Sequence, residues 1–352
     1  MNNNLSLYGW NSKLEQLKQQ SSHKSLSHGR ISVVHKTCYE VISANGLFQC
    51  ELTGNMMFGK PDSEMPCTGD WVIFQPFDES KGIIVDMLPR EHTLYRKKSG
   101  TISDKQMIAS YVDKAFIVQS LDDNFNMRRV ERFMVQILEE NITPVLVLNK
   151  ADLGFDKQYV DESIKHLTSQ MNVFITSVHH PETIIQLRNS ITEGETVVFI
   201  GSSGVGKSSL VNALCDKSQL HTSHISSSTG KGRHTSTRRE MVLMEGSGIL
   251  IDTPGVREFG LTVDNPDSLA EMLEISNYSG SCRFADCTHI NEPGCSVLKA
   301  VEDGLLENSV YQSYLKLRRE AWHFSTSEHE KRKREKSLSK LIEEVKKRKG
   351  YV

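Results

Sequence analysis

The stretch TVVFIGSSGVGKSSL, residues 196–210, joins an apolar run to a glycine-rich loop and then to a helical pattern. Within it, GSSGVGKS at 201–208 has the spacing G-x-x-x-x-G-K-[ST] of a phosphate-binding loop, and the flanking strand and helix supply the context that this motif requires. Backbone N–H groups of such a loop, and the start of the following helix, point at phosphate oxygens. The stretch therefore predicts a P-loop domain, and residues 201–208 are called the phosphate loop below.

The residue types in this loop predict their roles. Lys207 brings positive charge to the β- and γ-phosphates and is expected to assist catalysis, and the Ser208 hydroxyl is expected to bind Mg²⁺. An ordinary Gly/Ser turn is the alternative, which the strand–loop–helix context disfavours. The predicted nucleotide-binding residues of this region are Gly201, Ser202, Ser203, Gly204, Val205, Gly206, Lys207, Ser208 and Ser209.

A second predicted strand end, VLVLNKADLG at 145–154, carries Asn149, Lys150, Ala151 and Asp152, the NKAD segment. A carboxylate at position 152 can accept hydrogen bonds from the ring N–H and the exocyclic amine of guanine, whereas adenine presents an acceptor there. Asn149 is expected at the O6/N7 side of the base, and the Lys150 stem is expected to cover the base plane. The segment thus predicts a guanine nucleotide and disfavours an ATP-using enzyme. Thr176-Ser177 either completes the base pocket or forms a plain strand-end turn.

The third candidate element is ILIDTPG, 249–255, a predicted strand that ends in D-x-x-G. Asp252 is expected to hold the Mg²⁺ shell through water, and the Gly255 N–H to approach a γ-phosphate. Taken alone, D-x-x-G at a strand end is often only a turn. Its place downstream of the phosphate loop favours the nucleotide-binding interpretation.

A polar segment, SHISSSTGKGRHTSTRRE at 223–240, lies where a γ-phosphate-sensing switch is expected. Thr235 is the first candidate for the Mg²⁺-binding threonine and Thr237 the second. His234 is a candidate for positioning water, because Val256 after D-T-P-G cannot orient one. A flexible loop with a solvated histidine is the alternative.

Alternation of predicted strands and helices from about residue 113 indicates an α/β domain with a parallel sheet covered on both faces. In chain order, the NKAD segment precedes the phosphate loop, the reverse of an ordinary GTPase. A circular permutation explains this order, since motifs on adjacent strands keep their places when the chain ends are moved to another exposed loop. The predicted strands are 114–121, 143–148, 172–176, 195–200 and 249–255, and the predicted helices are 127–140, 156–169, 182–191 and one from 207.

The flanking regions predict further domains. Residues 30–98 contain short β-type runs between turn signals, which favours a small closed barrel, best matched by an OB-fold, with a barrel that binds no ligand as the alternative. The polar residues 1–29 are expected to form a flexible arm. The permuted GTPase domain is assigned to 99–262, and a helical zinc-binding domain with a basic tail to 263–352.

Four potential metal ligands lie in CRFADCTHINEPGC: Cys282, Cys287, His289 and Cys295. Thiolate and imidazole ligands at this spacing predict a closed, structural Zn²⁺ site, and unrelated buried cysteines are the alternative. The tail, 316–352, has 13 Lys or Arg against 6 Glu, which is typical of an RNA-contacting arm or of a solvated charged helix.

Composition limits the classes of protein to consider. A formal net charge of −2 argues against a uniformly basic nucleic-acid binder, and no apolar run is long enough to span a membrane. The odd count of 7 cysteines, with three in 282–295, indicates a reduced compartment rather than a secreted disulfide framework. A cytoplasmic protein is expected.

In the order and sequence of NKAD, GSSGVGKSSL, GKGRHTST, DTPGVREFGL and the cysteine motif, the chain resembles the RsgA (YjeQ/YloQ) family of GTPases. The resemblance implies an OB-fold, a permuted GTPase domain, GTP and GDP with Mg²⁺, and one zinc ion. It also implies a monomer that binds the small (30S) ribosomal subunit and its 16S rRNA, acts in late maturation, and hydrolyses GTP faster with the subunit. Val256 agrees with the apolar residue that the family has after D-T-P-G. The predicted switch reads HTST in this chain, where many members of the family have HTTT. The alternative is an RNA-binding module that uses GTP as a conformational ligand with negligible turnover.

Overall fold

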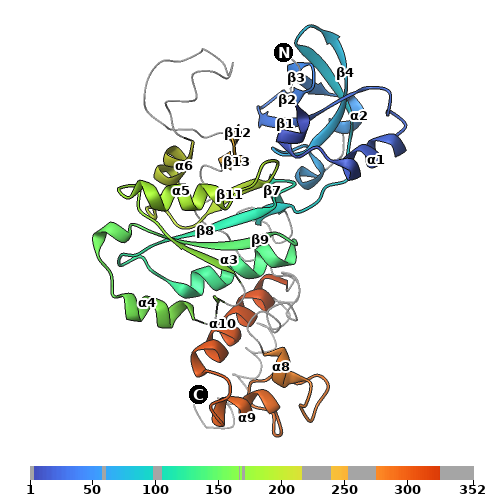
Figure 1. Cartoon of the computed structure of the whole chain (residues 1–352). Helices are drawn as coiled ribbons and strands as arrows, with labels where there is room; N and C mark the ends of the chain where they lie inside the picture. The colour runs from blue at the N-terminus through green and yellow to red at the C-terminus, as the bar shows by residue number, and fades with distance from the viewer. Residues whose placement is uncertain are drawn as a thin grey trace, which may run out of the picture. The chain divides into compact units, whose positions relative to one another are not determined.

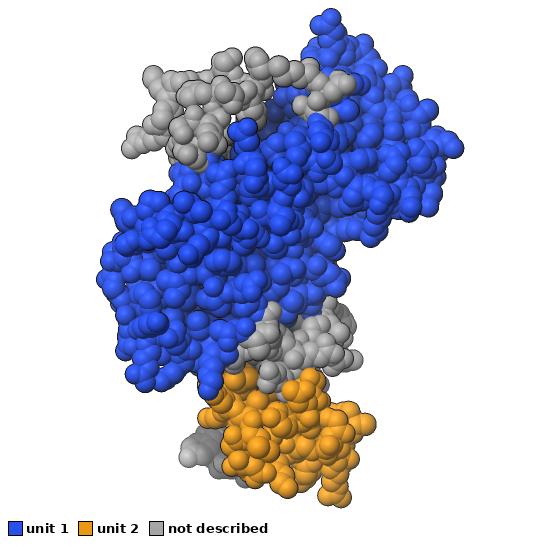
Figure 2. Space-filling view, in the orientation of Figure 1, with its two compact units in different colours: residues 1–96, 105–259 blue, residues 97–104, 260–352 orange. Residues whose placement is uncertain are grey.

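The computed structural model describes residues 4–57, 61–97, 105–165, 167–168, 171–215, 239–252 and 275–325. The chain divides into two compact units, one of residues 1–96 and 105–259 and the other of residues 97–104 and 260–352 (Figure 2). The predicted barrel and the predicted nucleotide-binding domain both belong to the first unit, and the four metal-ligand candidates belong to the second. The boundaries assigned between barrel, GTPase domain and C-terminal domain stay predictions.

A five-stranded barrel forms the N-terminal part of the first unit (Figure 1). The strand order β1-β2-β3-β5-β4 closes because β1 also pairs with β4, and β3 runs parallel to β5. This arrangement confirms the predicted OB-like barrel. The strands are β1 Ser27–Val34, β2 Tyr39–Ser43, β3 Gly46–Leu52, β4 Trp71–Asp78 and β5 Lys81–Met87, with α2 Gly54–Met57 and a 3₁₀ turn Asp62–Glu64 between β3 and β4. The barrel core is made of Ile31, Tyr39, Val41, Phe48, Cys50, Val72, Phe74 and Ile84.

The predicted flexible arm is wrong for its described residues, which are folded. A 3₁₀ turn, Leu5–Tyr8, leads into α1, Ser12–Gln20, which begins where the Asn11 side chain accepts a hydrogen bond from the Leu14 N–H. Leu5 and Leu14 are buried with Trp71, Ile73 and Leu88. The segment is polar overall, but Leu5 and Leu14, with the partly buried Tyr8, Trp10 and Leu17, pack against these barrel residues and so dock the segment on the barrel.

The GTPase part of the first unit is a six-stranded sheet in the order β10-β9-β8-β11-β13-β12. Its strands are parallel except β12, which runs antiparallel to β13. The sequence did not predict β12, which also pairs with β1 of the barrel at Val33 and Glu240 and so joins the two sheets. The bounds are β8 Lys114–Ser120, β9 Thr143–Asn149, β10 Asn172–Ile175, β11 Thr196–Ile200, β12 Glu240–Leu243 and β13 Ile249–Asp252.

Helices cover this sheet on both faces, as predicted. Helix α3, Met127–Glu139, packs on β8 and β9, while α5, Pro181–Asn189, and α6, Lys207–Leu214, share a core cluster on the other face (Figure 1). That cluster includes Phe116, Val118, Val145, Val147, Val197, Phe199, Leu187 and Leu210. The remaining elements are a 3₁₀ turn Ala151–Leu153, α4 Lys157–Ile164, and a two-stranded sheet of β6 Leu94–Lys97 and β7 Lys105–Ala109.

The described part of the second unit between residues 275 and 325 consists of helices and the loops that join them. It contains α8 Ser276–Ser279, α9 Ser296–Glu302 and α10 Asn308–Ser325, and the cysteine motif lies between α8 and α9. Most of the basic tail, 326–352, lies outside the described residues. In the part of the chain that the structure describes, no helix has both the length and the apolar character to cross a membrane.

Candidate functional site

The predicted nucleotide-binding motifs meet at one edge of the parallel sheet. Strands β9, β11 and β13 end at Asn149, Ile200 and Asp252, and β8 lies between β9 and β11. Because the carboxyl ends of parallel strands share an edge, the NKAD segment, the phosphate loop and Asp252 lie on the same side of the domain. The order of these motifs along the chain therefore differs from the order of their strands in the sheet, as a circular permutation requires.

The phosphate loop is pressed against the sheet edge and the NKAD segment. Gly201 and Gly206 have φ angles of +148° and +94°. A Cβ on Gly201 would lie 2.4 Å from the Val118 carbonyl oxygen, and one on Gly206 would lie 2.3 Å from the Asn149 side-chain nitrogen. Only glycine satisfies both the backbone conformation and the space at these two positions.

Lys207, the first residue of α6, folds back onto the loop that precedes it. Its ammonium group donates to the carbonyl oxygens of Gly201 and Ser202, at 2.7 and 2.6 Å. Ser203, Gly204, Ser208 and Ser209 are exposed. The loop thus presents a cation, an accessible backbone and the predicted Mg²⁺-binding hydroxyl beside one another.

Asn149 connects the NKAD segment to the phosphate loop. Its side chain is buried, its amide nitrogen donates to the Val205 carbonyl oxygen at 2.9 Å, and its amide oxygen accepts from the Thr176 hydroxyl at 3.2 Å. The Asn149 side chain thus connects the NKAD segment to both Val205 of the phosphate loop and Thr176.

Asp152 is exposed at the same edge, and its carboxylate accepts a hydrogen bond from the Ser177 hydroxyl. This hydrogen bond is the main cause that lowers the pKa of Asp152, so the carboxyl group stays ionised, as guanine recognition requires. The Ala151 N–H donates to the Thr176 carbonyl oxygen at 3.1 Å. Thr176-Ser177 is therefore more than a turn, because both residues hold the NKAD segment.

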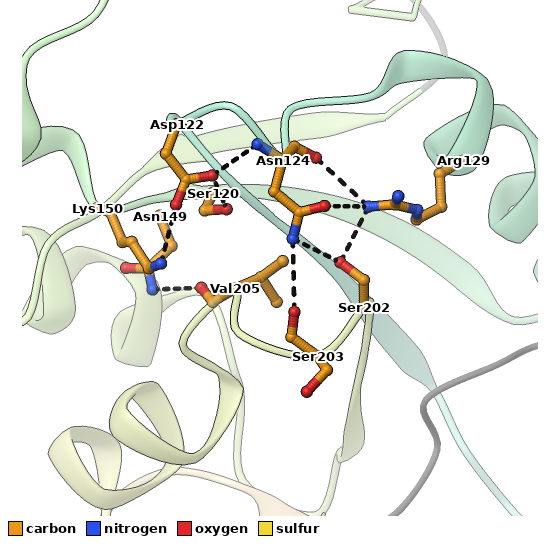
Figure 3. Close-up of polar contacts among 9 residues, drawn as sticks. All are labelled: Ser120, Asp122, Asn124, Arg129, Asn149, Lys150, Ser202, Ser203 and Val205. Carbon is orange, nitrogen blue, oxygen red and sulfur yellow. Dashed lines mark hydrogen bonds and ion pairs between the residues drawn. The ribbon is translucent and has the colours of Figure 1, made fainter.

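Asp122 is a residue of this site that the sequence analysis did not identify. It accepts from the Lys150 ammonium group at 2.9 Å, from the Ser120 hydroxyl at 2.6 Å and from the Asn124 N–H at 3.0 Å (Figure 3). Partial burial raises the pKa of Asp122, but the hydrogen bonds from Ser120 and Lys150 outweigh it and lower the pKa to about 2. Its position just after the predicted strand 114–121 was the available signal.

Most of the predicted switch segment, residues 223–238, lies outside the described residues. Asp252, the last residue of β13, lies opposite Glu240 of the antiparallel neighbour β12. On its other side, β13 runs parallel to β11, the strand that leads into the phosphate loop. His234, Thr235, Thr237, Gly255 and Val256 lie outside the described residues. Of the residues predicted to serve Mg²⁺, the structure describes Ser208 and Asp252, and the part assigned to the switch threonine stays a prediction.

In the second unit, Cys282, Cys287, His289 and Cys295 form the predicted cluster, with their ligand atoms all within 4.8 Å of one another. The His289 Nδ1 atom lies 3.6 Å from the Cys282 sulfur and 3.5 Å from the Cys295 sulfur, and these two sulfurs are 3.9 Å apart. Zinc–sulfur bonds of about 2.3 Å in a tetrahedron place sulfurs roughly 3.8 Å apart. The four residues fit a closed zinc site with no position left for water.

Glu292, which was not predicted, organises the loop that holds these ligands. Its carboxylate accepts from the backbone N–H and the hydroxyl of Thr288, and from the N–H groups of Ile290 and Asn291. The Thr288 hydroxyl is the main cause that lowers the pKa of Glu292 to about 2. The Tyr311 hydroxyl, from α10, donates to the His289 carbonyl oxygen at 2.8 Å. These contacts fix the loop from both sides.

Comparison with known proteins agrees with this geometry. The family model described as RsgA GTPase matches residues 87–262, and the model described as 50S ribosome-binding GTPase matches residues 196–348. "Small ribosomal subunit biogenesis GTPase RsgA 1" of Bacteroides thetaiotaomicron is 72% identical over 349 residues, which cover 99% of this chain and 98% of the relative. The corresponding GTPase of Methanosarcina acetivorans is 38% identical over 320 residues, 90% of this chain and 85% of the relative.

Two solved structures share the fold. YjeQ from Thermotoga maritima matches with a TM-score of 0.65 at 24% identity and covers 84% of this chain and 98% of its own. YloQ, described as a circularly permuted GTPase, matches with a TM-score of 0.64 at 23% identity and covers 88% and 99%. The motifs, their permuted order and these relatives show that the chain belongs to the RsgA family of P-loop GTPases.

Proposed function

We propose that this GTPase acts in the biogenesis of the small ribosomal subunit, binding the subunit and hydrolysing GTP to GDP and phosphate with stimulation by it. The observation that carries the proposal is the contact of Asn149 with Val205, which joins a guanine-recognition segment to a phosphate loop in one site. The name of the 72% identical relative, which spans nearly the whole chain, supplies the ribosomal context.

Within this proposal, each part of the site has one task. Asp152 selects guanine, and residues 201–209 bind the phosphates. Ser208, Asp252 and Thr235, with Thr237 as the second choice, serve Mg²⁺, which neutralises the charge that develops on the phosphates. Gly255 contacts the γ-phosphate, and His234 positions the attacking water. Support comes from the shared strand edge of the described residues and from the motif positions of the others.

The cluster Cys282, Cys287, His289 and Cys295 holds one structural zinc ion in the proposal. A closed Cys₃His site contributes folding energy and no catalytic water. Its place here is to shape the loop between α8 and α9, from which Arg283 and Phe284 are available to a partner: Phe284 is exposed, and the Arg283 guanidinium lies 5.5 Å from its ring centre.

The partner is assigned to the small subunit and, within it, to 16S rRNA. One family model is named for the 50S subunit, but it matches the chain only from residue 196, whereas the relative named for the small subunit aligns over 99% of the chain. The barrel and the basic tail offer the RNA-contacting surfaces. The protein acts as a monomer in the cytoplasm in this proposal.

Steady-state GTP hydrolysis with and without purified small subunits tests the proposal. Slow turnover that rises at least about tenfold with small subunits, and not with large ones, is expected, because a partner that completes a P-loop site typically speeds hydrolysis strongly. Equal turnover in all three conditions would refute it. Tight GTP binding with negligible turnover throughout would instead support the RNA-binding module that uses GTP as a conformational ligand.

A further inference from the structure

The loop between β8 and α3 contacts the phosphate loop through two side chains that no motif predicts. The Asn124 amide nitrogen lies 3.2 Å from the Ser202 hydroxyl and 3.4 Å from the Ser203 carbonyl oxygen. The Arg129 guanidinium donates through Nη1 to the same Ser202 hydroxyl at 2.9 Å (Figure 3). Ser202 and Ser203 form the first turn of the phosphate loop, so this turn is held from outside the loop.

Asn124 and Arg129 also hold each other. Arg129 Nη1 donates to the Asn124 side-chain oxygen at 3.0 Å and lies 3.4 Å from its carbonyl oxygen. The Asn124 amide is thereby oriented with its oxygen toward the cation and its nitrogen toward Ser202 and Ser203 (Figure 3). A planar guanidinium that meets several acceptors fixes such an arrangement more strictly than a lysine would.

The position of Arg129 is electrostatically unfavourable for the helix that carries it. Helix α3 begins at Met127 with Asn126 as its N-cap, and its first turn contains two arginines and no acidic residue. The N-terminal end of a helix carries partial positive charge, so cations there weaken the helix. Arg128 shares this disadvantage, so the functional argument for Arg129 rests on its hydrogen bond to Ser202.

The same loop reaches the NKAD segment. Asp122 accepts from the Asn124 N–H at 3.0 Å and from the Lys150 ammonium group at 2.9 Å. An unbroken set of hydrogen bonds therefore runs from Lys150 through Asp122 and Asn124 to Ser202 (Figure 3). Together with the contact of Asn149 and Val205, it connects the NKAD segment to both halves of the phosphate loop.

We propose that Asn124 and Arg129 are positioning residues of the nucleotide site, which hold Ser202 and Ser203 in the phosphate-binding conformation at a fixed place relative to Lys150. The proposal rests on the guanine-nucleotide site proposed above. Arg129 acts on the phosphate loop through Ser202, and it takes no part in the chemical step. Loss of Arg129 therefore weakens the binding of the ground state and of the transition state to the same extent. Such a loss raises KM and leaves kcat nearly unchanged.

The test uses the full-length chain with Arg129→Met and the matched control Arg128→Met. Arg128 is the exposed neighbour in the same helical turn and has no hydrogen bond to another described residue, so the control makes the same charge change without touching Ser202. Arg129→Met should raise the KM for GTP and the Kd for GDP by about tenfold, with kcat within about twofold of wild type. Arg128→Met should match wild type in all three constants. The KM and Kd of Arg129→Lys should lie between those of Arg128→Met and Arg129→Met.

A double-mutant cycle with Ser202→Ala makes the test specific. Arg129→Met and Ser202→Ala remove the same hydrogen bond, so the double variant should lose less affinity than the product of the two single effects. Independent effects would refute the proposal. A lower kcat at unchanged KM would also refute it, because Arg129 would then act in the transition state, and a lower Tm with unchanged constants would leave Arg129 only a structural role.

Lys207→Ala separates failure of this proposal from failure of the nucleotide site itself. Loss of GTP binding in Lys207→Ala, together with Arg129→Met behaving like Arg128→Met, would refute only the positioning role. Unchanged GTP binding in Lys207→Ala would refute the site on which the proposal rests.

Discussion

The nucleotide site of the first unit draws on distant parts of the chain, whereas the metal cluster of the second is nearly contiguous. Asn149, the phosphate loop and Asp252 are brought to one side of the domain by the order of strands in a sheet that rests on a large cluster of buried apolar residues. The cluster uses four residues within 282–295, flanked by α8 with four residues and α9 with seven. Local sequence sets the metal ligands, and the topology of the whole domain sets the nucleotide site.

This difference has an energetic consequence. The site residues of the first unit are held by hydrogen bonds to neighbouring strand ends, and the sheet behind them persists when one such bond is lost. A closed zinc site contributes folding energy to the loop that forms it, so we expect the cluster to draw a large part of its local stability from a bound ion. Substitution of a metal-ligand candidate should therefore unfold the surrounding loop, whereas substitution in the nucleotide site should change binding and leave the sheet intact.

The largest effect is expected for Cys287→Ser. Loss of one of four ligands should abolish zinc binding, and protection of the 282–295 backbone from hydrogen exchange should be lost with it, since structural zinc contributes on the order of 10 kcal/mol to such loops. GTP binding and the protection of β8 and β9 should be unchanged. Metal analysis combined with hydrogen-exchange mass spectrometry measures both. Full zinc retention would refute the ligand assignment.

Asp152→Asn should reverse base specificity. The amide cannot accept from both guanine donors but can donate to a carbonyl at the same ring position, as in xanthine. GTP affinity should fall roughly 100-fold while affinity for xanthosine triphosphate rises. Competition binding with both nucleotides measures the switch, and parallel losses for both would argue against base recognition by Asp152.

Gly206→Ala tests the contact between the NKAD segment and the phosphate loop. A Cβ there meets the Asn149 amide, while one on Gly204, whose φ is also positive, meets open space. Both substitutions cost about 1–2 kcal/mol for the left-handed conformation, so any additional loss of unfolding free energy in Gly206→Ala reports the contact with Asn149. We expect the excess to be about 1–3 kcal/mol. Chemical denaturation of the nucleotide-free protein measures the two free energies, and equal losses would contradict the packing described here.

The smallest effect is expected for Ser177→Ala, which removes the hydrogen bond that lowers the pKa of Asp152. A lowered pKa keeps the carboxylate ionised to lower pH, so guanine affinity persists above that pKa and is lost as pH falls through it. In Ser177→Ala the loss should begin at higher pH, with affinity near neutral pH reduced only a few fold. Titration of GDP affinity from acidic to neutral pH measures the shift, with Ser163→Ala as the control, because among the described residues the half-buried Ser163 hydroxyl donates only to the Tyr159 carbonyl oxygen. Superimposable pH profiles would contradict the role of Ser177.

Much of the fold followed from the sequence because its signals are local. Each motif can be recognised within a few residues of sequence: GSSGVGKS and NKAD at predicted strand ends, and the four candidate metal ligands in one short segment. Strand β12 was missed because it is only four residues long and is defined by its pairing with β13 and β1. Asp122, Asn124 and Arg129 were missed for a related reason. The partners that connect them to the site are Lys150, Ser202 and Ser203, which lie at other strand ends, and no periodicity along the chain reports such contacts.

Co-sedimentation with purified ribosomal subunits tests the proposed role most directly. In a non-hydrolysable GTP analogue, the protein should sediment with small subunits and not with large ones, and GDP should release it. Asp152→Asn should lose this response to the GTP analogue and regain it with the matching xanthosine analogue. Equal sedimentation in GTP analogue and GDP, or a preference for large subunits, would contradict a nucleotide-controlled function on the small subunit.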